Sequence, residues 1–368
     1  MPARALVAVS AALASLLLFA CGDGGEGKTK QAGTPQQRLA AALDPCAEGG
    51  DAFAHSVCAN RTLAGIDGQI RETLVAEAAE VSAAGAEMLA RNQQRWRTAQ
   101  RIECGILEPD AQPDAEQLAC LEGGFRSRAA DAQNAVQAIG GYTFQRMELV
   151  DANPVTIEVA AASGLGEEAP AAIIRDIRFP RIDGEQTPEI QRFNALVAQQ
   201  PQFGLEDATN EVVDYHIAYA GAEIISVRFD MSSDTLGAAH PSNSIKAVTV
   251  LMHTGQQLRE TDVFRADTRW QDFIAARAVR ELGRQFREYD FNPPERDVRE
   301  SATKPHLWIV GESGLTLLFP PLSFGGSHAD GDAQVRISWA DLRPYLNPEA
   351  PAPINAVAQN SAENRAGR

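Results

Sequence analysis

Apolar residues recur at helical spacing through the first third of the chain. From Arg61 to Ala84 they fall near every third or fourth position, in a stretch rich in Ala and Glu, which favour helices. Gly85 indicates a break, and the same spacing resumes from Ala86 to Glu103. A third helix is predicted from Asp114 to Ile139, after two prolines that are typical of turns. The short connections between these segments predict a small helical bundle.

From Gly141 onward the pattern changes to an alternation of apolar and polar residues, which is typical of strands. Strands are predicted at 142–150, 155–159, 173–179, 211–219, 222–230, 244–252, 306–310, 314–319 and 333–338. A turn is predicted at Pro180–Gly184, and helices are predicted at Thr187–Ala198 and Arg269–Glu288, where helical spacing returns. This order predicts an α+β domain after the bundle, with a mostly antiparallel sheet packed by two helices.

The N-terminus carries an apolar run, residues 5–20, after a single positive residue, Arg4. The run is about 16 residues long, shorter than the roughly 20 that a membrane span needs, and is typical of a secretory signal. It ends in Leu18-Phe19-Ala20-Cys21, which resembles the lipobox of bacterial lipoproteins; this resemblance implies cleavage before Cys21 and attachment of lipid to its sulfur. The alternative is an ordinary secretory signal beside an incidental cysteine. We therefore expect a lipid-anchored protein of the cell envelope that faces the periplasm, and Gly22 favours the outer membrane in an organism that has one.

Composition divides the chain into five parts. Residues 1–20 form the predicted signal peptide and 21–43 a Gly-rich, polar tether. The helical domain is predicted at 44–140 and the α+β domain at 141–346. Residues 347–368 are rich in Pro and Ala and otherwise polar, and we expect a disordered tail there.

The chain is strongly acidic. It has 49 Asp and Glu against 33 Lys and Arg, a formal net charge of -16. Stripes of basic residues are absent from the sequence, so nucleic acid is not an expected partner. An acidic surface keeps a protein soluble, which is its commoner role, and it also steers basic partners toward the protein.

Cysteine placement predicts two disulfides in an oxidising compartment. Besides Cys21, the cysteines are Cys46, Cys58, Cys104 and Cys120, all within about 75 residues. An even number in an exported segment is typical of disulfides, and the sequence leaves three pairings open. A metal site is disfavoured because no Cys-x-x-Cys pair is present.

The cysteines are interleaved with a second set of residues in a definite order. Cys46 and Cys58 precede Leu63 and Ile66-Asp67, then Gln94-Arg95-Trp96 leads to Cys104, and Cys120-Leu121 opens the last helix. Over residues 44–135 this order resembles the bacterial lysozyme-inhibitor domain first named from a mycobacterial lipoprotein. The resemblance implies a small helical domain of periplasmic proteins, some of which inhibit lysozyme. Trp96 and the arginines around it are more readily interpreted as a core residue and a solvated face than as a binding patch.

The second half carries a further set of motifs in order. These are Phe179-Pro180, Asn194, Gly237–Pro241, Thr254-Gly255, Asp262–Phe264 and Leu342–Leu346. Over residues 171–346 they resemble a domain family of unknown function that occurs at the C-terminus of a lysozyme-sensing anti-sigma factor and beside some peptidoglycan deacetylases. The family often has a tyrosine-rich loop before its last strand, where this chain has Pro320–Gly326. If that loop binds a partner, the partner or the affinity differs here.

Motifs of catalysis are absent from the sequence. There is no Gly-x-Ser-x-Gly elbow, no His-Glu-x-x-His helix and no phosphate-binding loop, so we expect a protein that is not an enzyme and has no cofactor. The histidines are not grouped at metal spacing, and Asp330 and Asp332 indicate a polar turn rather than a cation site. His240, Pro241 and Phe324 are the candidate binding residues, although a structural role is the favoured interpretation for His240 and Pro241.

Two functions are compatible with these observations. The first is an envelope-anchored protein that binds or inhibits lysozyme, since both halves resemble families with lysozyme-linked members and an acidic chain suits a basic partner. The alternative is a module that binds peptidoglycan or assists a cell-wall enzyme. The partner would be lysozyme or another basic envelope protein in the first case, and the membrane is contacted only through the lipid.

Overall fold

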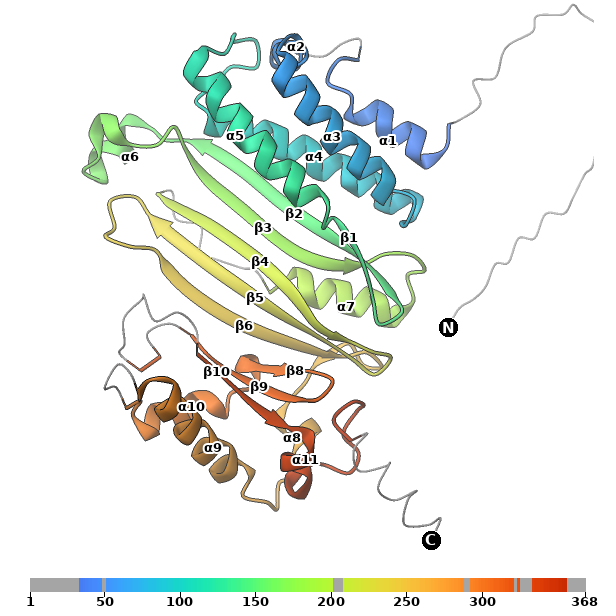
Figure 1. The fold of residues 1–368 in the computed structure, drawn as a ribbon, viewed down its shortest axis with the longest axis vertical. Coiled ribbons are helices and arrows are strands. Elements are labelled where there is room, and N and C mark those ends of the chain that lie inside the picture. Colours follow the sequence, from blue (N-terminus) through green and yellow to red (C-terminus); the bar gives the residue numbers. More distant parts are fainter. Residues whose placement is uncertain are drawn as a thin grey trace, which may run out of the picture. The chain divides into compact units, whose positions relative to one another are not determined.

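The computed structural model describes residues 33–47, 51–200, 208–287, 292–320, 323–324 and 333–355. The predicted signal peptide, Cys21, the acidic turn at Asp330 and Asp332, and residues 356–368 lie outside the described residues. The described chain has a helical N-terminal region, followed by an α+β region with a mostly antiparallel sheet (Figure 1). This confirms the predicted fold class.

Five helices form the N-terminal region. They are α1 Pro35–Leu43, α2 Ala52–Ala59, α3 Arg61–Glu77, α4 Ala83–Glu103 and α5 Ala115–Ala132. Each begins after a residue whose side chain accepts a hydrogen bond from the first turn, namely Thr34, Asp51, Asn60, Ser82 and Asp114. Leu63, Ile70, Leu121 and Phe125 meet in a shared core. Capping therefore sets the helix starts, and apolar burial holds the helices together.

Two disulfides close this region, as the sequence predicts. Cys46 pairs with Cys58 and Cys104 pairs with Cys120, which selects one of the three open pairings. The first joins the α1–α2 connection to α2, and the second joins the end of α4 to α5. The segment between Cys104 and Cys120, which are 16 positions apart, is thereby tied at both ends beside the helical core.

Three predictions for the helical half are wrong in detail. Residues 35–43 of the expected tether form α1, because Leu39 and Leu43 are buried in the core. Gly85 lies inside α4 and not at a break; a Cβ there would lie 2.9 Å from Asp183 Oδ1, so glycine permits close approach to the sheet. The third helix ends at Ala132, and residues 136–139 form a strand instead.

A seven-stranded sheet follows, with its strands in chain order. They are β1 Val136–Ile139, β2 Tyr142–Pro154, β3 Ala172–Ile182, β4 Thr209–Ala220, β5 Ile224–Thr235, β6 Ser242–Leu251 and β7 Gln256–Gln257. Every neighbouring pair is antiparallel except β3 and β4, which are parallel. The β1–β2 turn is Gly140-Gly141, both with positive φ, and a Cβ at Gly140 would collide with the backbone of Ala220. Helix α7, Pro188–Ala198, buries Phe193 and Val197 against the sheet.

The β2–β3 connection differs from the prediction. Residues 155–159 were expected as a strand, but Ile157–Ala162 is a short helix, α6, because the Thr156 hydroxyl accepts from Val159 N and caps it. A 3-10 turn, Gly166–Glu168, follows. The predicted turn at Pro180–Gly184 begins later, since β3 continues to Ile182 in register with β2.

The C-terminal part contains a second sheet, ordered β10-β9-β8 and antiparallel. Its strands are β8 Trp308–Val310, β9 Gly314–Phe319 and β10 Ala333–Ser338. The helices beside it are α8 Glu260–Val263, α9 Trp270–Gln285, α10 Glu295–Ala302 and α11 Trp339–Leu342, with 3-10 turns at Pro305–Leu307 and Arg343–Tyr345. Ile354 and Ala350 are buried in this core, so the tail expected from residue 347 is packed at least to residue 355.

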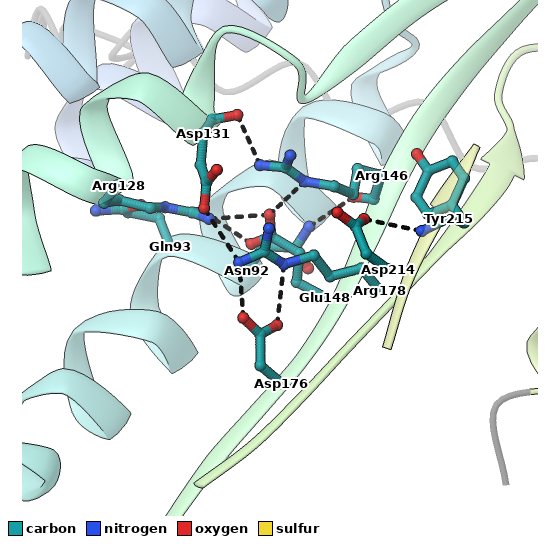
Figure 2. A network of polar contacts seen from close by, with 10 residues as sticks. All are labelled: Asn92, Gln93, Arg128, Asp131, Arg146, Glu148, Asp176, Arg178, Asp214 and Tyr215. Carbon is teal, nitrogen blue, oxygen red and sulfur yellow. Dashed lines mark hydrogen bonds and ion pairs between the residues drawn. The ribbon is translucent and has the colours of Figure 1, made fainter. Parts of the chain in front are cut away.

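A buried polar network joins the helical region to the sheet (Figure 2). The Glu148 side chain on β2 accepts hydrogen bonds from Arg128 of α5 at 2.9 Å and from Arg146 at 2.7 Å. Arg128 also donates to Gln93 of α4 at 2.8 Å, and Asn92 donates to the Arg146 carbonyl at 2.9 Å. Because α4, α5 and β2 share these contacts, the bundle and the sheet are packed together rather than joined by a tether.

Candidate functional site

The binding residues predicted from sequence lie in separate elements. His240 and Pro241 are exposed at the turn between β5 and β6, where His240 Nδ1 lies 3.3 Å from the Pro241 carbonyl oxygen. Phe324 packs instead in the C-terminal core, with its ring 5.3 Å from that of Phe319. A role of these three residues in binding stays a prediction.

Trp96 is a packing residue of the bundle. Its ring meets Phe125 edge to face at 4.9 Å, and the Arg128 guanidinium lies 5.6 Å from the ring centre. The arginines near it divide between buried structural contacts and exposed positions: Arg97 pairs with buried Asp67 at 2.5 Å, whereas Arg95 is exposed. They do not form one patch with Trp96.

A different surface combines features of a binding site. A hollow of about 620 Å³ lies between the loop that follows α4 and the β2–β3 connection. Most of the residues around it are apolar or glycine: Gly105, Leu107, Val155, Ile157, Ala160, Ala161, Gly166, Ala169, Pro170 and Ala171. Leu107 is 48% exposed and Ile157 is 84% exposed, and both are among the most exposed large apolar side chains of the described residues. Exposed apolar groups gathered at one hollow are typical of an interaction site.

The first wall of the hollow is held by a buried cation and a disulfide. Arg101 of α4 donates to the carbonyl oxygens of Ile106 and Leu107, the latter at 2.6 Å. Gln117 donates to the Gly105 carbonyl at 3.1 Å, and the Cys104–Cys120 bridge closes the loop. Leu107 is thus fixed at the surface by its own backbone contacts, which lowers the entropy lost when a partner binds.

The second wall is closed at its base by the sheet. Val155 N donates to the Ala171 carbonyl at 3.0 Å, directly after the last β2–β3 pair. The two walls approach closely, because a Cβ on Gly105 would lie 3.6 Å from the Ala171 Cβ. Helix α6 then presents Ile157 outward.

The two segments that form this hollow carry carboxylates and no basic residue. Residues 105–119 and 152–174 contain no Lys or Arg. They contain seven exposed acidic residues: Glu108, Asp110, Asp114, Glu116, Glu158, Glu167 and Glu168. A hydrogen bond from its own backbone N–H and one from the Thr156 hydroxyl hold the pKa of Glu158 below its ordinary value, so this carboxylate is charged at neutral pH. Glu167 lines the hollow itself, and the other six carboxylates lie elsewhere in the two segments that form it.

An apolar hollow between two acidic segments is chemically suited to contact with a basic protein. Interfaces commonly have an apolar centre and a polar rim, with charge complementarity between partners. Within the described residues no His, Cys, Asp or Glu group is arranged to hold a metal ion, and no helix is long and apolar enough to cross a membrane. Sequence reasoning missed the site because a strand at 155–159 would have paired Ile157 into the sheet. The sequence feature that could have indicated this site is the lack of Lys and Arg over long stretches of both loops.

Comparisons with known proteins add the following. No family model and no curated protein matches the chain. A solved structure of a DUF3298 family member from Bacteroides fragilis NCTC 9343 has 11% identity and a TM-score of 0.37, and covers 57% of this chain and 96% of its own. A DUF3298 family protein from Pseudomonas aeruginosa PAO1 has 10% identity and a TM-score of 0.41, with the same coverage of both chains.

Similarity at this level carries no inference about a site or an activity. The resemblance of the helical region to the lysozyme-inhibitor domain stays a prediction.

Proposed function

We propose that this chain is a lipid-anchored binding protein of the bacterial cell envelope, and that the hollow, with the carboxylates of its two loops as an acidic rim, docks a basic protein, with lysozyme as the expected partner. The observation that carries the proposal is the placement of Leu107 and Ile157, exposed at one hollow between two loops without a basic residue. An apolar contact at the centre would supply most of the affinity, and the carboxylates would supply steering and orientation.

Binding is tested with the chain from residue 22 onward, without the predicted signal and Cys21. Calorimetry with hen-type lysozyme at low and moderate salt is run beside a lysozyme turnover assay. We expect binding that weakens as salt rises, because exposed charges are screened. Lost turnover would make the chain an inhibitor, and retained turnover would make it a sensor or decoy.

The hollow is tested with the double variant Leu107→Ala and Ile157→Ala. We expect the Kd to rise at least about tenfold, which corresponds to about 1.4 kcal/mol, because two central apolar contacts are lost. Val212→Ala is the matched control: Val212 is 45% exposed on β4 and does not line the hollow, so its Kd should not change. An unchanged Kd in the double variant would place the interface elsewhere.

Absence of any lysozyme binding at low salt would overturn the proposal, and retention on purified peptidoglycan would then favour the cell-wall alternative.

A further inference from the structure

A second hollow lies beside the first and has the opposite charge. This cleft, of about 560 Å³, is formed by α4 and the ends of β2 and β3. It is lined by Arg91, Gln94, Arg95, Thr98, Ala99 and Ile102 of α4, by residues 150–153 of β2 and by Arg175 of β3. The volume falls within the range of small-molecule sites, about 300–1,000 Å³. Three arginines at one cleft are unusual on a chain whose net charge is -16.

The two arginines that α4 contributes to the cleft are available to an anion. Arg95 is exposed and, within the described residues, makes no hydrogen bond or ion pair. Arg91, one helical turn earlier, has only a 3.9 Å contact with the exposed Glu87. Weak surface pairs of this kind contribute little to stability and are readily exchanged for a ligand.

The Arg175 side chain is held in place by a carboxylate of the neighbouring strand β4. Its Nε donates at 2.8 Å to Glu211 on β4, whose side chain is only 2% exposed. A buried carboxylate fixes the plane of the guanidinium group in the way that a supporting residue orients a ligand-binding side chain. The cleft therefore combines one fixed arginine from the sheet with two exposed arginines from the helix, of which Arg91 has only the weak contact with Glu87.

The remaining residues narrow the ligand chemistry. Ala99, Ile102, Val150 and Ala152 offer apolar surface for a short aliphatic group. Gln94, Thr98 and Asn153 offer polar contacts, and Asp151 is the single carboxylate in the lining. Asp151 would repel a dianion such as phosphate but would accept a hydrogen bond from an ammonium group.

We propose that this cleft binds a small zwitterionic carboxylate of amino-acid or dipeptide size, with its carboxylate on Arg91, Arg95 and Arg175 and its ammonium on Asp151. The planar fork of a guanidinium group matches a carboxylate through two parallel hydrogen bonds. The ligand is separate from the basic protein proposed for the neighbouring hollow, and its binding does not depend on that partner.

The test uses the chain from residue 22 onward and the dipeptide alanylalanine, with binding followed by calorimetry. We expect the C-terminal amide to bind at least about tenfold more weakly, because the carboxylate is lost, and the N-acetyl form to bind several-fold more weakly. Inorganic phosphate should bind more weakly than the dipeptide. No binding of the dipeptide, or equal binding of the acid and the amide, would overturn the proposal; tighter binding of phosphate would also overturn it, in favour of a general anion site.

Substitutions of the cleft arginines test whether the dipeptide binds in this cleft. Arg95→Ala should weaken dipeptide binding at least about tenfold, and Arg95→Lys should restore part of it, because a lysine keeps the charge but loses the fork. Arg280→Ala, at an exposed position of α9, is the matched control and should bind as the parent does. An equal effect of both alanine variants would overturn the assignment to the cleft. Lysozyme is absent from these measurements, so their failure is distinct from failure of the docking proposal.

Discussion

Glu148 is a carboxylate that depends on its two arginine partners. Its side chain is about as buried as the apolar core, and it lies between Arg128 and Arg146, which are also buried. Burial raises the pKa of the Glu148 carboxyl, but the charges and hydrogen bonds of Arg128 and Arg146 outweigh burial and hold the pKa below its ordinary value. The network in Figure 2 therefore holds charged groups in place at the junction of α4, α5 and β2.

Glu148→Gln should destabilise the fold strongly. The amide leaves two buried guanidinium groups without a counter-charge, and loss of one partner of a buried pair costs about 3–5 kcal/mol. The free energy of unfolding is measured by urea denaturation. Glu122→Gln is the control, because Glu122 pairs with Arg126 at the exposed surface of α5 and such pairs contribute up to about 1 kcal/mol. Equal effects of the two variants would show that the network contributes no more than a surface pair.

The same variant has a pH signature. A carboxyl whose folded pKa is depressed contributes stability above its unfolded pKa, about 4.3, and this contribution is lost as pH falls through the folded pKa. The stability difference between the parent and Glu148→Gln should therefore be constant from pH 7 to about pH 5 and shrink below about pH 4. A difference that is constant down to pH 2 would contradict the depressed pKa.

At the scale of elements, the two disulfides have similar loop lengths but different neighbours. Their sequence separations are 16 and 12 residues, so removal of either is expected to cost about 3 kcal/mol of stability. Only the Cys104–Cys120 bridge closes the loop that presents Leu107. Removal of each disulfide in turn can therefore distinguish an effect on stability from an effect on binding at the hollow.

The variant with Cys104→Ala and Cys120→Ala should lose affinity for lysozyme as well as stability. The loop from 105 to 119 gains freedom when the bridge is removed, and ordering it again upon binding raises the Kd. The matched control is Cys46→Ala with Cys58→Ala, which should lose stability alone. Calorimetry is performed well below both unfolding midpoints. A similar rise of the Kd in both variants would indicate a general loosening of the bundle.

Element boundaries show where sequence reasoning succeeds and where it fails. The regular helices and long strands could be predicted because burial on one face imposes a period, as in α9 and β4. Helix α6 could not, because Val155–Val159 alternates like a strand, and only the cap at Thr156 and the position outside the sheet decide its conformation. The two hollows were also beyond prediction, because each is formed by segments that are remote in sequence.

At the scale of the whole molecule, charge is uneven rather than simply negative. The arginine-lined cleft uses residues 98–102 and 150–153, and the acidic-rimmed hollow uses residues 105–107 and 155–157 of the same two segments. Surfaces of opposite sign therefore adjoin within a chain of net charge -16. A basic partner could be steered by the total charge of the chain or by the local carboxylates near the hollow, and these two explanations predict different effects of mutation.

Position and total charge can be separated by two charge-matched variants. Glu108→Lys with Asp110→Lys, and Glu72→Lys with Glu80→Lys, each make the net charge less negative by four, but only the first pair lies in the loop that carries Leu107 and belongs to the proposed rim. If the rim steers lysozyme, the first variant should slow association about tenfold or more at low salt, and the second should change it little. The difference should vanish toward 0.5 M salt, where the screening length falls well below about 8 Å. Association rates are measured by stopped-flow fluorescence. Equal slowing by both variants would mean that the partner senses only the overall charge, and the acidic rim would then have no special part in recognition.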